Sequence, residues 1–193
     1  MVGLQRVWWK RVLPVQAPYR WNLRRLQPGF MLDIGCGIGR SLLHIDGNGV
    51  GVDHNAGSVA CAQGRGLRAF TSTEFPRTEF ARDGVFDSML LSHVAEHMTR
   101  PELVELLKVY VPFVRIGGKV IVITPQEAGF DSDDSHIMFA DWDAIGAAAD
   151  EVGLVNLTSY SFPFPRVVGR VFLYNEFVWV GEVTEGCLQA LAD

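Results

Sequence analysis

A glycine-rich turn preceded by an acid is the first feature of this 193-residue sequence with an evident chemical use. It reads Leu32-Asp33-Ile34-Gly35-Cys36-Gly37-Ile38-Gly39-Arg40 and follows an apolar run. Glycine lets a backbone turn sharply and approach a ligand closely. A dinucleotide fingerprint needs Gly or Ala where Arg40 stands, so the pattern does not favour a phosphate site. The carboxylate of Asp33 instead suits a ligand with a cationic ammonium or sulfonium group.

A second acid, Asp53, directly follows the apolar segment 49–52. Acids at this point of nucleotide-binding folds accept hydrogen bonds from ribose hydroxyls. Each charge-assisted bond of this kind contributes about 1.5–3 kcal/mol. Together with the missing phosphate site, Asp53 predicts a ligand that contains a nucleoside but no phosphate.

The third chemical pattern is His93-Val94-Ala95-Glu96-His97, which spells H-x-x-E-H. In zinc peptidases this pattern places two histidines on one helix face and a glutamate beside the activated water. A zinc hydrolase is therefore one hypothesis. Against it, catalytic zinc needs a third protein ligand, and the segment follows an expected strand rather than lying within a long helix.

Short apolar runs alternate with segments of helical spacing along the chain. The expected strands are 30–34, 49–52, 67–71, 86–91, 119–124, 154–160 and 171–180, and the expected helices are 55–64, 101–114 and 141–152. This alternation predicts a Rossmann-like α/β fold: a seven-stranded, mostly parallel sheet with helices on both faces. The last two strands have too short a connection for a crossover, so the last strand is expected to be antiparallel. Ligands of such folds bind beyond the carboxyl ends of the strands.

These features together resemble the class I S-adenosylmethionine-dependent methyltransferases, over about residues 30–154. The family pattern matches at Asp33, Gly35, Gly37, Gly39 and Asp53, and the segments 86–97 and 116–119 are similar to its fourth-strand segment and to the turn before its fifth strand. The resemblance implies S-adenosylmethionine as cofactor. The core residues that it places at the cofactor are Asp33, Gly35, Cys36, Gly37, Asp53, His54, Thr73, Glu74, Phe75, Ser92 and His93.

In that family the segment after the third strand cups the adenine, which here gives Phe75 an apolar face toward the base. Whether Glu74 takes the adenine amine or faces solvent stays open, because this sequence has Thr71 and Ser72 where the family often has an acid. The resemblance also leaves open whether Glu96 and His97 fix the turn or border the substrate.

The methyl acceptor is expected at the long polar segment 124–141, which follows the fifth expected strand. Methyl transfer to a hydroxyl needs an oriented nucleophile and a base for its proton. His136 is the candidate base, with Glu96 as a second catalytic candidate, and Glu127 or Asp134 could hold sugar hydroxyls or a divalent ion such as Mg²⁺. The stretch through His136 and Phe139 resembles small bacterial methyltransferases of sugars and polysaccharides. The predicted acceptor is therefore a small molecule or an oligosaccharide.

Two further segments are expected to border the acceptor. Residues 1–28 form a basic, tryptophan-rich arm before the catalytic core of residues 29–193, and a lid over the cleft would let Arg20 pair with the methionine carboxylate while Trp9 stacks on a sugar. The aromatic tail around Arg170 could line a carbohydrate platform or a homodimer face. A non-catalytic subunit that binds the cofactor without turnover is a further alternative.

Length and composition limit the remaining classes. The chain has the length of a single domain, and no apolar stretch reaches the roughly 20 residues of a membrane span. Six basic residues and no acidic one lie in residues 1–25, so the remainder carries 11 − 22 = −11 charges and disfavours nucleic acid as a partner. Three widely spaced cysteines offer no disulfide framework, so a reducing, cytoplasmic location is expected.

Overall fold

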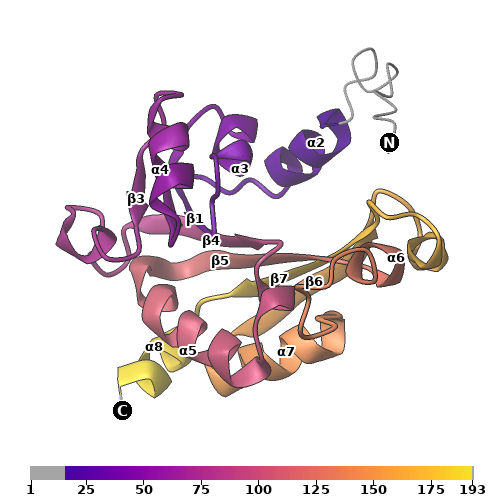
Figure 1. Ribbon diagram of the computed structural model, residues 1–193. Helices are drawn as coiled ribbons and strands as arrows, with labels where there is room; N and C mark the ends of the chain where they lie inside the picture. The colour runs from indigo at the N-terminus through magenta and orange to yellow at the C-terminus, as the bar shows by residue number, and fades with distance from the viewer. Residues whose placement is uncertain (1–15, 193) are drawn as a thin grey trace.

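The sheet is the frame of the molecule, and the computed structural model describes residues 16–192. Seven strands lie in the order β3-β2-β1-β4-β5-β7-β6 within these residues (Figure 1). They are β1 (Met31–Ile34), β2 (Gly49–Asp53), β3 (Ala69–Thr71), β4 (Phe86–Ser92), β5 (Val114–Pro125), β6 (Val155–Phe162) and β7 (Glu176–Glu182). The first five are parallel, and β7 is antiparallel to both β5 and β6. The predicted Rossmann-like sheet is confirmed.

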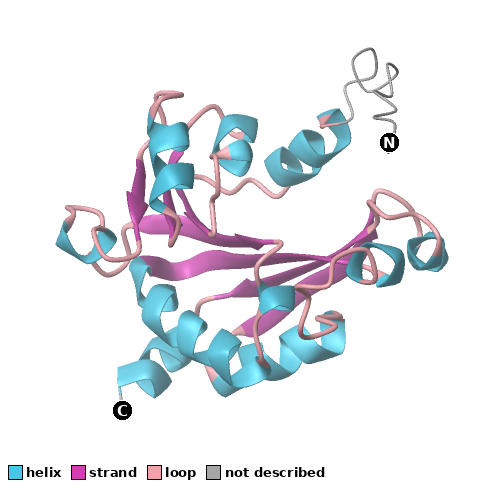
Figure 2. Cartoon of the chain, viewed as in Figure 1, coloured by secondary structure: helices cyan, strands magenta, loops and turns pink. Residues whose placement is uncertain are grey.

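Helices cover both faces of the sheet, as predicted (Figure 2). One layer contains α2 (Ala17–Arg25), α3 (Arg40–His44) and α4 (Ala56–Gln63), and the other contains α5 (Arg100–Tyr110), α7 (Trp142–Glu151) and α8 (Glu185–Ala192). The short α6 (Glu127–Phe130) follows β5, and residues 16–192 also form the 3₁₀ turns η1 (Phe75–Arg77), η2 (Ala95–His97), η3 (Val111–Phe113) and η4 (Arg166–Arg170). Within residues 16–192, no helix combines the length and apolarity needed to cross a membrane.

Each face of the sheet has its own apolar core. Leu32, Met89 and Trp179 belong to the core under α5 and α7, whereas Leu42, Leu90 and Val178 belong to the core under α2, α3 and α4. Every residue of β1 and β2 is buried. Burial on both faces explains why these strands are continuous apolar runs, and it leaves the strand ends as the place for polar chemistry.

The predicted last strand, 171–180, is wrong at its start. Residues 166–170 form η4, and β7 begins only at Glu176. The buried Asn175 ends the loop: its side-chain amide donates to Gln126 Oε1 at 2.9 Å, and its Oδ1 accepts the backbone N–H of Phe164 at 2.9 Å. These bonds keep residues 163–175 in a loop. In a strand, side chains alternate between the two faces of the sheet, so these hydrogen bonds would be lost.

The described part of the amino-terminal arm is docked on the sheet layer. The hydroxyl of Tyr160 donates to the buried Asn22 at 2.7 Å, the hydroxyl of Tyr19 donates to the carbonyl of Tyr174 at 2.7 Å, and Leu23 is buried. Helix α2 is therefore held against β6 and the loop before β7. Trp9, expected to contact substrate, lies outside the described residues.

Candidate functional site

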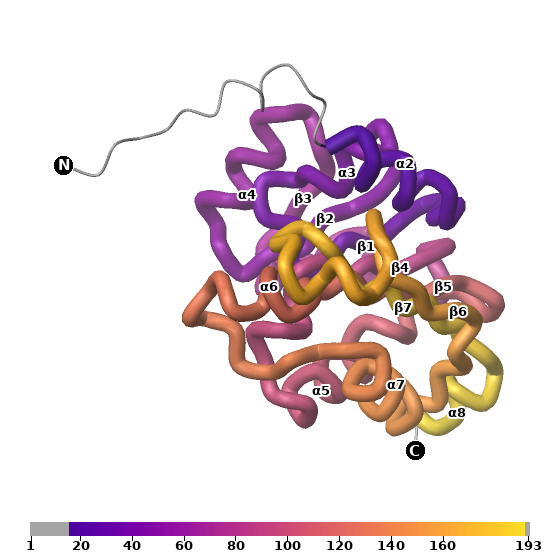
Figure 3. The backbone as a smooth tube through the Cα atoms, turned by 90° about the vertical axis from the view of Figure 1, so that its right-hand side faces the viewer, coloured from indigo at the N-terminus to yellow at the C-terminus, as the bar shows by residue number. Residues whose placement is uncertain are grey.

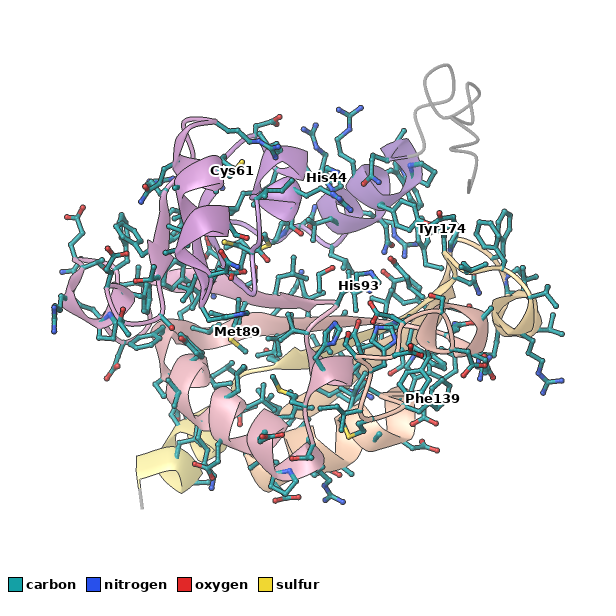
Figure 4. The ribbon with its side chains drawn as sticks, viewed as in Figure 1. His44, Cys61, Met89, His93, Phe139 and Tyr174 are labelled. Carbon is teal, nitrogen blue, oxygen red and sulfur yellow. The ribbon has the colours of Figure 1, made fainter. Side chains whose placement is uncertain are left out.

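The carboxyl ends of β1, β2 and β4 bring the predicted acids and His93 to one edge of the sheet. Asp33 and Ser92 lie at or near the ends of the paired strands β1 and β4, and Asp53 ends the neighbouring β2. Figure 4 shows His93 at this edge, between the two helical layers, whereas His44 and Cys61 lie on the helices of one layer. The parallel topology thus assembles residues that are far apart in the sequence.

The carboxylate of Asp53 organises the glycine turn. Its Oδ2 accepts the backbone N–H of Gly37 and its Oδ1 accepts the backbone N–H of Asn55, both at 2.8 Å. Asn55 in turn caps α4 by accepting the N–H of Ser58. A carboxylate oxygen has two lone pairs, so each oxygen of Asp53 still has capacity for a ligand hydroxyl.

Two glycines of the turn are required for different reasons. Gly35 has φ +70°, and a Cβ there would lie 2.4 Å from Val94 Cγ2, so the turn packs directly on the segment after β4. Gly37 has φ +51°, and a Cβ there would have no described atom within 4 Å. Gly37 therefore faces open space at the strand edge, where a ligand could approach the backbone.

Asp33 is the most unusual acid of the site. Only 1% of it is exposed, and its Oδ2 has no hydrogen-bond partner among residues 16–192. Burial and then the charge of Asp53 raise the pKa of Asp33 to about 8. A buried polar group without a partner is costly, so Asp33 is suited to a ligand that brings a positive charge or donors.

The structure corrects the expected platform at Phe75 and relocates the side chain of Cys36. The Phe75 ring is 1% exposed and packs against Tyr110 and Phe113, so it offers no open face to a base. The Cys36 side chain is turned toward Gly51 in the core, and burial raises the pKa of its thiol to about 12. Cys36 therefore offers no thiolate to a ligand.

The other residues expected near the adenosine lie on the surface of the same edge. Glu74 accepts the backbone N–H of Thr71 at 2.9 Å and its hydroxyl at 2.8 Å, and these bonds lower the pKa of Glu74. Thr73 Oγ1 lies 3.1 Å from Thr71 Oγ1. His54 is exposed, with Nδ1 3.6 Å from Asp53 Oδ1. Glu74 thus shapes the turn after β3.

His93 is held between two buried carboxylates. Its Nε2 lies 3.0 Å from Glu176 Oε1 and its Nδ1 lies 3.2 Å from Glu96 Oε1, and the side chain is 47% exposed. Burial lowers the pKa of His93, but the contacts with Glu176 and Glu96 outweigh burial and raise it to about 10. His93 also has φ +57°, a conformation uncommon outside glycine and often found at functional sites.

Sequence reasoning missed Glu176. This residue begins β7, which comes from the antiparallel part of the sheet, and the charge of His93 opposes the burial that raises the pKa of Glu176. The one signal in the sequence was that Asn175 and Glu176 interrupt an otherwise apolar run. Figure 3 shows the loop before β7 crossing the edge of the central strands, and so explains how these residues reach the site.

Two further histidines, His97 of η2 and His136 of the loop after β5, lie together next to Glu96. The backbone N–H groups of Ile137 and Met138 donate to the carbonyl of Glu96 at 2.7 and 3.2 Å, so this loop is fixed to η2. The rings of His97 and His136 have centroids 4.9 Å apart, and His136 also stacks on Phe130. The structure thus joins Glu96 and His136, the two predicted catalytic residues, at one place.

Not all of the residues predicted to bind substrate have side chains available at the strand edge. Glu127 forms a bidentate ion pair with Arg166. This pair lowers the pKa of Glu127 and uses both oxygens of its carboxylate. The charge of Arg170 also lowers the pKa of Glu127. Asp134 is exposed on the loop after α6. Arg20 is exposed on α2. Its charge adds to the effect of partial burial on His44 of α3, and both lower the pKa of that histidine.

One surface pocket lies away from this edge of the sheet. A pocket of about 360 Å³ is lined by Asp83, Gly84, Pro112, Val114, Arg115, Ile116, Leu188 and Leu191. Most of these residues precede or begin β4 and β5, so the pocket lies at the amino ends of these strands. Its apolar lining offers little of the acid and histidine chemistry that gathers at the carboxyl ends.

Burial of Asp33 predicts a pH-dependent cost to stability. Between pH 4 and pH 8 the unfolded chain loses the Asp33 proton while the native chain keeps it, so native stability falls as the pH rises. We expect denaturant unfolding to show that Asp33→Asn gains stability relative to the wild type across this interval. Parallel stability curves for the two proteins between pH 4 and pH 8 would contradict the assignment.

The comparisons with known proteins agree with this geometry. Residues 32–122 match the family model described as a methyltransferase domain, and this segment contains the glycine turn, Asp53 and the segment after β4. No curated protein is similar enough in sequence to count as a match.

Solved structures share the fold at low sequence identity. An S-adenosylmethionine-dependent methyltransferase from Archaeoglobus fulgidus is 17% identical, with a TM-score of 0.68 over 94% of this chain and 100% of that chain. A chain in the complex of the Haloferax volcanii Trm112 methyltransferase activator with a putative methyltransferase is 18% identical, with a TM-score of 0.68 over 88% of this chain and 90% of that chain. Geranyl diphosphate methyltransferase in complex with GPP and sinefungin is 15% identical, with a TM-score of 0.65 over 89% of this chain and 79% of that chain. The chain thus has the fold of S-adenosylmethionine-dependent methyltransferases, and its residues 32–122 match a methyltransferase domain.

Proposed function

We propose that this protein transfers a methyl group from S-adenosylmethionine to an oxygen of a small hydroxylated acceptor. The observation that carries the proposal is the arrangement of Asp33 and Asp53 at neighbouring strand ends, on either side of a glycine that faces open space. The matched methyltransferase domain supports the same reading.

The residues present fit the cofactor. Asp53 has lone pairs left for the two ribose hydroxyls, and Gly37 leaves room for the ligand to approach the backbone. The buried Asp33 has a side-chain oxygen that lacks a partner in the described chain, and a nearby cationic ligand would favour the ionised form of this acid. Ser92 and His93 border the same edge at the end of β4.

S-adenosylmethionine supplies a methyl group on a positively charged sulfonium, which makes that carbon electrophilic. The remaining work of the chain is to orient the acceptor, exclude water and accept the hydroxyl proton. Attack by the acceptor oxygen would form the new C–O bond and leave the C–S bonding pair on sulfur. His136 is the proposed base: its Nδ1 donates to the carbonyl of Phe130 at 2.7 Å, so in the neutral ring Nε2 is the nitrogen that can accept a proton.

We propose a sugar or another small polyol as the acceptor. The supporting features are the polar loop after β5 and the exposed aromatic side chains of Phe164 and Tyr174 in the loop before β7, since aromatic faces pack against sugar rings. Arg170 and Asp134 lie on the same two loops and offer hydrogen bonds to hydroxyl groups. Screening hydroxylated metabolites and oligosaccharides with methyl-labelled cofactor, read by mass spectrometry, would identify the acceptor.

Removal of the ribose acid should weaken cofactor binding. Asp53→Ala should reduce the affinity for both S-adenosylmethionine and S-adenosylhomocysteine at least tenfold, because one or two charge-assisted hydrogen bonds are lost. Isothermal titration calorimetry measures both ligands, and the exposed Asp150→Asn on α7 is the control for loss of charge. Unchanged affinity in a folded Asp53→Ala would exclude the ribose role.

The open space at Gly37 should belong to the cofactor. Gly37 and Gly66 both have positive φ, and an added Cβ would meet no described atom within 4 Å at either residue. Alanine should therefore cost each position a similar amount of stability, about 1 kcal/mol. We expect only Gly37→Ala to weaken S-adenosylhomocysteine binding in calorimetry. Equal ligand affinity in the two variants would show that the space at Gly37 is not used.

Loss of His136 should slow turnover without releasing the cofactor. With an acceptor identified by the screen, His136→Ala should lower kcat by about 10²–10⁴-fold, the usual cost of a lost general base, and leave cofactor affinity within a few-fold. His44→Ala on α3 serves as the matched histidine control. Turnover of His136→Ala at the wild-type rate would refute this role.

A further inference from the structure

Three residues beside the cofactor edge form a cluster with the composition of a metal site. Within the described part of the chain, one ligand atom from each of Glu96, His97 and His136 lies within 4.8 Å of the other two. Glu96 and His97 come from η2, and His136 comes from the loop after α6, which η2 holds through the carbonyl of Glu96. The cluster is therefore formed by two segments that are fixed to each other.

The carboxylate of Glu96 has an unusual environment. Glu96 is 0% exposed, and neither of its oxygens has a hydrogen-bond partner within residues 16–192. The ion-pair contact with His93 Nδ1 touches Oε1 at 3.2 Å and leaves Oε2 without any charged contact among the described side chains. His93 therefore offsets part of the charge of Glu96, and a cation at Oε2 would supply the partner that this buried oxygen lacks.

Both histidines are held by Nδ1, which leaves Nε2 as a ligand atom. His136 Nδ1 lies 2.7 Å from the Phe130 carbonyl, which can only accept, so Nδ1 carries the hydrogen. The Ser135 hydroxyl donates to Asp133 at 2.7 Å, so Ser135 Oγ accepts from His97 Nδ1 at 3.2 Å. A hydrogen bond from the second ring nitrogen to a carbonyl or hydroxyl is the arrangement that fixes metal-binding histidines.

The geometry separates this cluster from the H-x-x-E-H zinc pattern. Both ring nitrogens of His93 contact carboxylates, Glu176 and Glu96, and His93 is not in the three-residue group. The second histidine of the group is instead His136, about 40 residues later in the sequence. The zinc-peptidase arrangement, with His93 and His97 as paired ligands, is therefore not what the structure forms.

We propose that Glu96, His97 and His136 bind one divalent transition-metal ion of the zinc class. Two imidazoles and one carboxylate favour such an ion over Mg²⁺ and Ca²⁺, which prefer all-oxygen sites. Three protein ligands leave at least one coordination position for an oxygen of the acceptor. This role rests on the proposed function: the acceptor O–H would lose its proton to water at the ion, and His136 would act as a ligand in place of a direct base.

The test uses the full chain after a chelator has removed any metal. The metal-free protein is titrated with Co²⁺, and the visible absorption of Co²⁺ shows when nitrogen and oxygen ligands bind it. We expect one Co²⁺ per wild-type chain, displaced by Zn²⁺. His97→Ala, His136→Ala and Glu96→Gln should each weaken Co²⁺ binding by at least about tenfold, because each removes a ligand. His44→Ala, on α3, should bind Co²⁺ like the wild type. Circular dichroism confirms that each variant is folded.

The outcomes separate the metal site from the proposed function. No stoichiometric Co²⁺ in the wild type, or equal Co²⁺ binding in folded His97→Ala and His136→Ala, overturns the metal site. Calorimetry of S-adenosylhomocysteine on the same metal-free preparation reads the cofactor site independently. Full methyl transfer by the metal-free protein would overturn the catalytic role of the ion and leave His136 as the direct base. Loss of turnover on chelation, restored by Zn²⁺ or Co²⁺, supports it.

Discussion

Four acidic side chains buried at the carboxyl edge of the sheet are the constraint on which the rest of the site depends. Asp33, Asp53, Glu96 and Glu176 are each at most 8% exposed. A buried carboxylate needs donors or a cation, because the loss of hydration is otherwise uncompensated. Asp53 has backbone N–H groups and Glu176 has His93. Asp33 Oδ2 and Glu96 Oε2 have neither a hydrogen bond nor an ion pair in the described chain, and the two proposals supply a partner for each acid: a sulfonium cofactor and a metal ion.

The fold accounts for this concentration of charge. Parallel strands end at one edge, so acids at the ends of β1 and β2 must lie together, and the glycine turn lets the backbone pass close to them. The antiparallel β7 begins at the same edge, and its first residue, Glu176, lies opposite Pro125 at the end of β5. The loops after β5 and before β7 close the edge, with the buried Gln126 and Asn175 bonded to each other between them. One sheet therefore positions both the cofactor residues and the histidine cluster.

Local patterns predicted the sheet and the position of Asp33, the glycine turn and Asp53 at one of its edges, because buried parallel strands are continuous apolar runs and the glycine turn is contiguous in sequence. They failed where tertiary contacts decide. An aromatic residue such as Phe75 suits a ligand platform or a core equally by type, and only packing against Tyr110 and Phe113 shows that it is core. The start of β7 depends on bonds between Asn175 and residues from other segments. The pairing of His97 with His136 depends on the loop after β5, whose path no local spacing predicts.

Backbone hydrogen exchange with and without S-adenosylhomocysteine tests the central claim, that the acids at the carboxyl ends of β1 and β2 hold the cofactor, most directly. We expect added protection in the glycine turn 35–39, at Asn55 and in the segment 92–97, with little change around the pocket at 83–84 and 112–116. Protection confined to that pocket, or none in the glycine turn at saturating ligand, would contradict the claim.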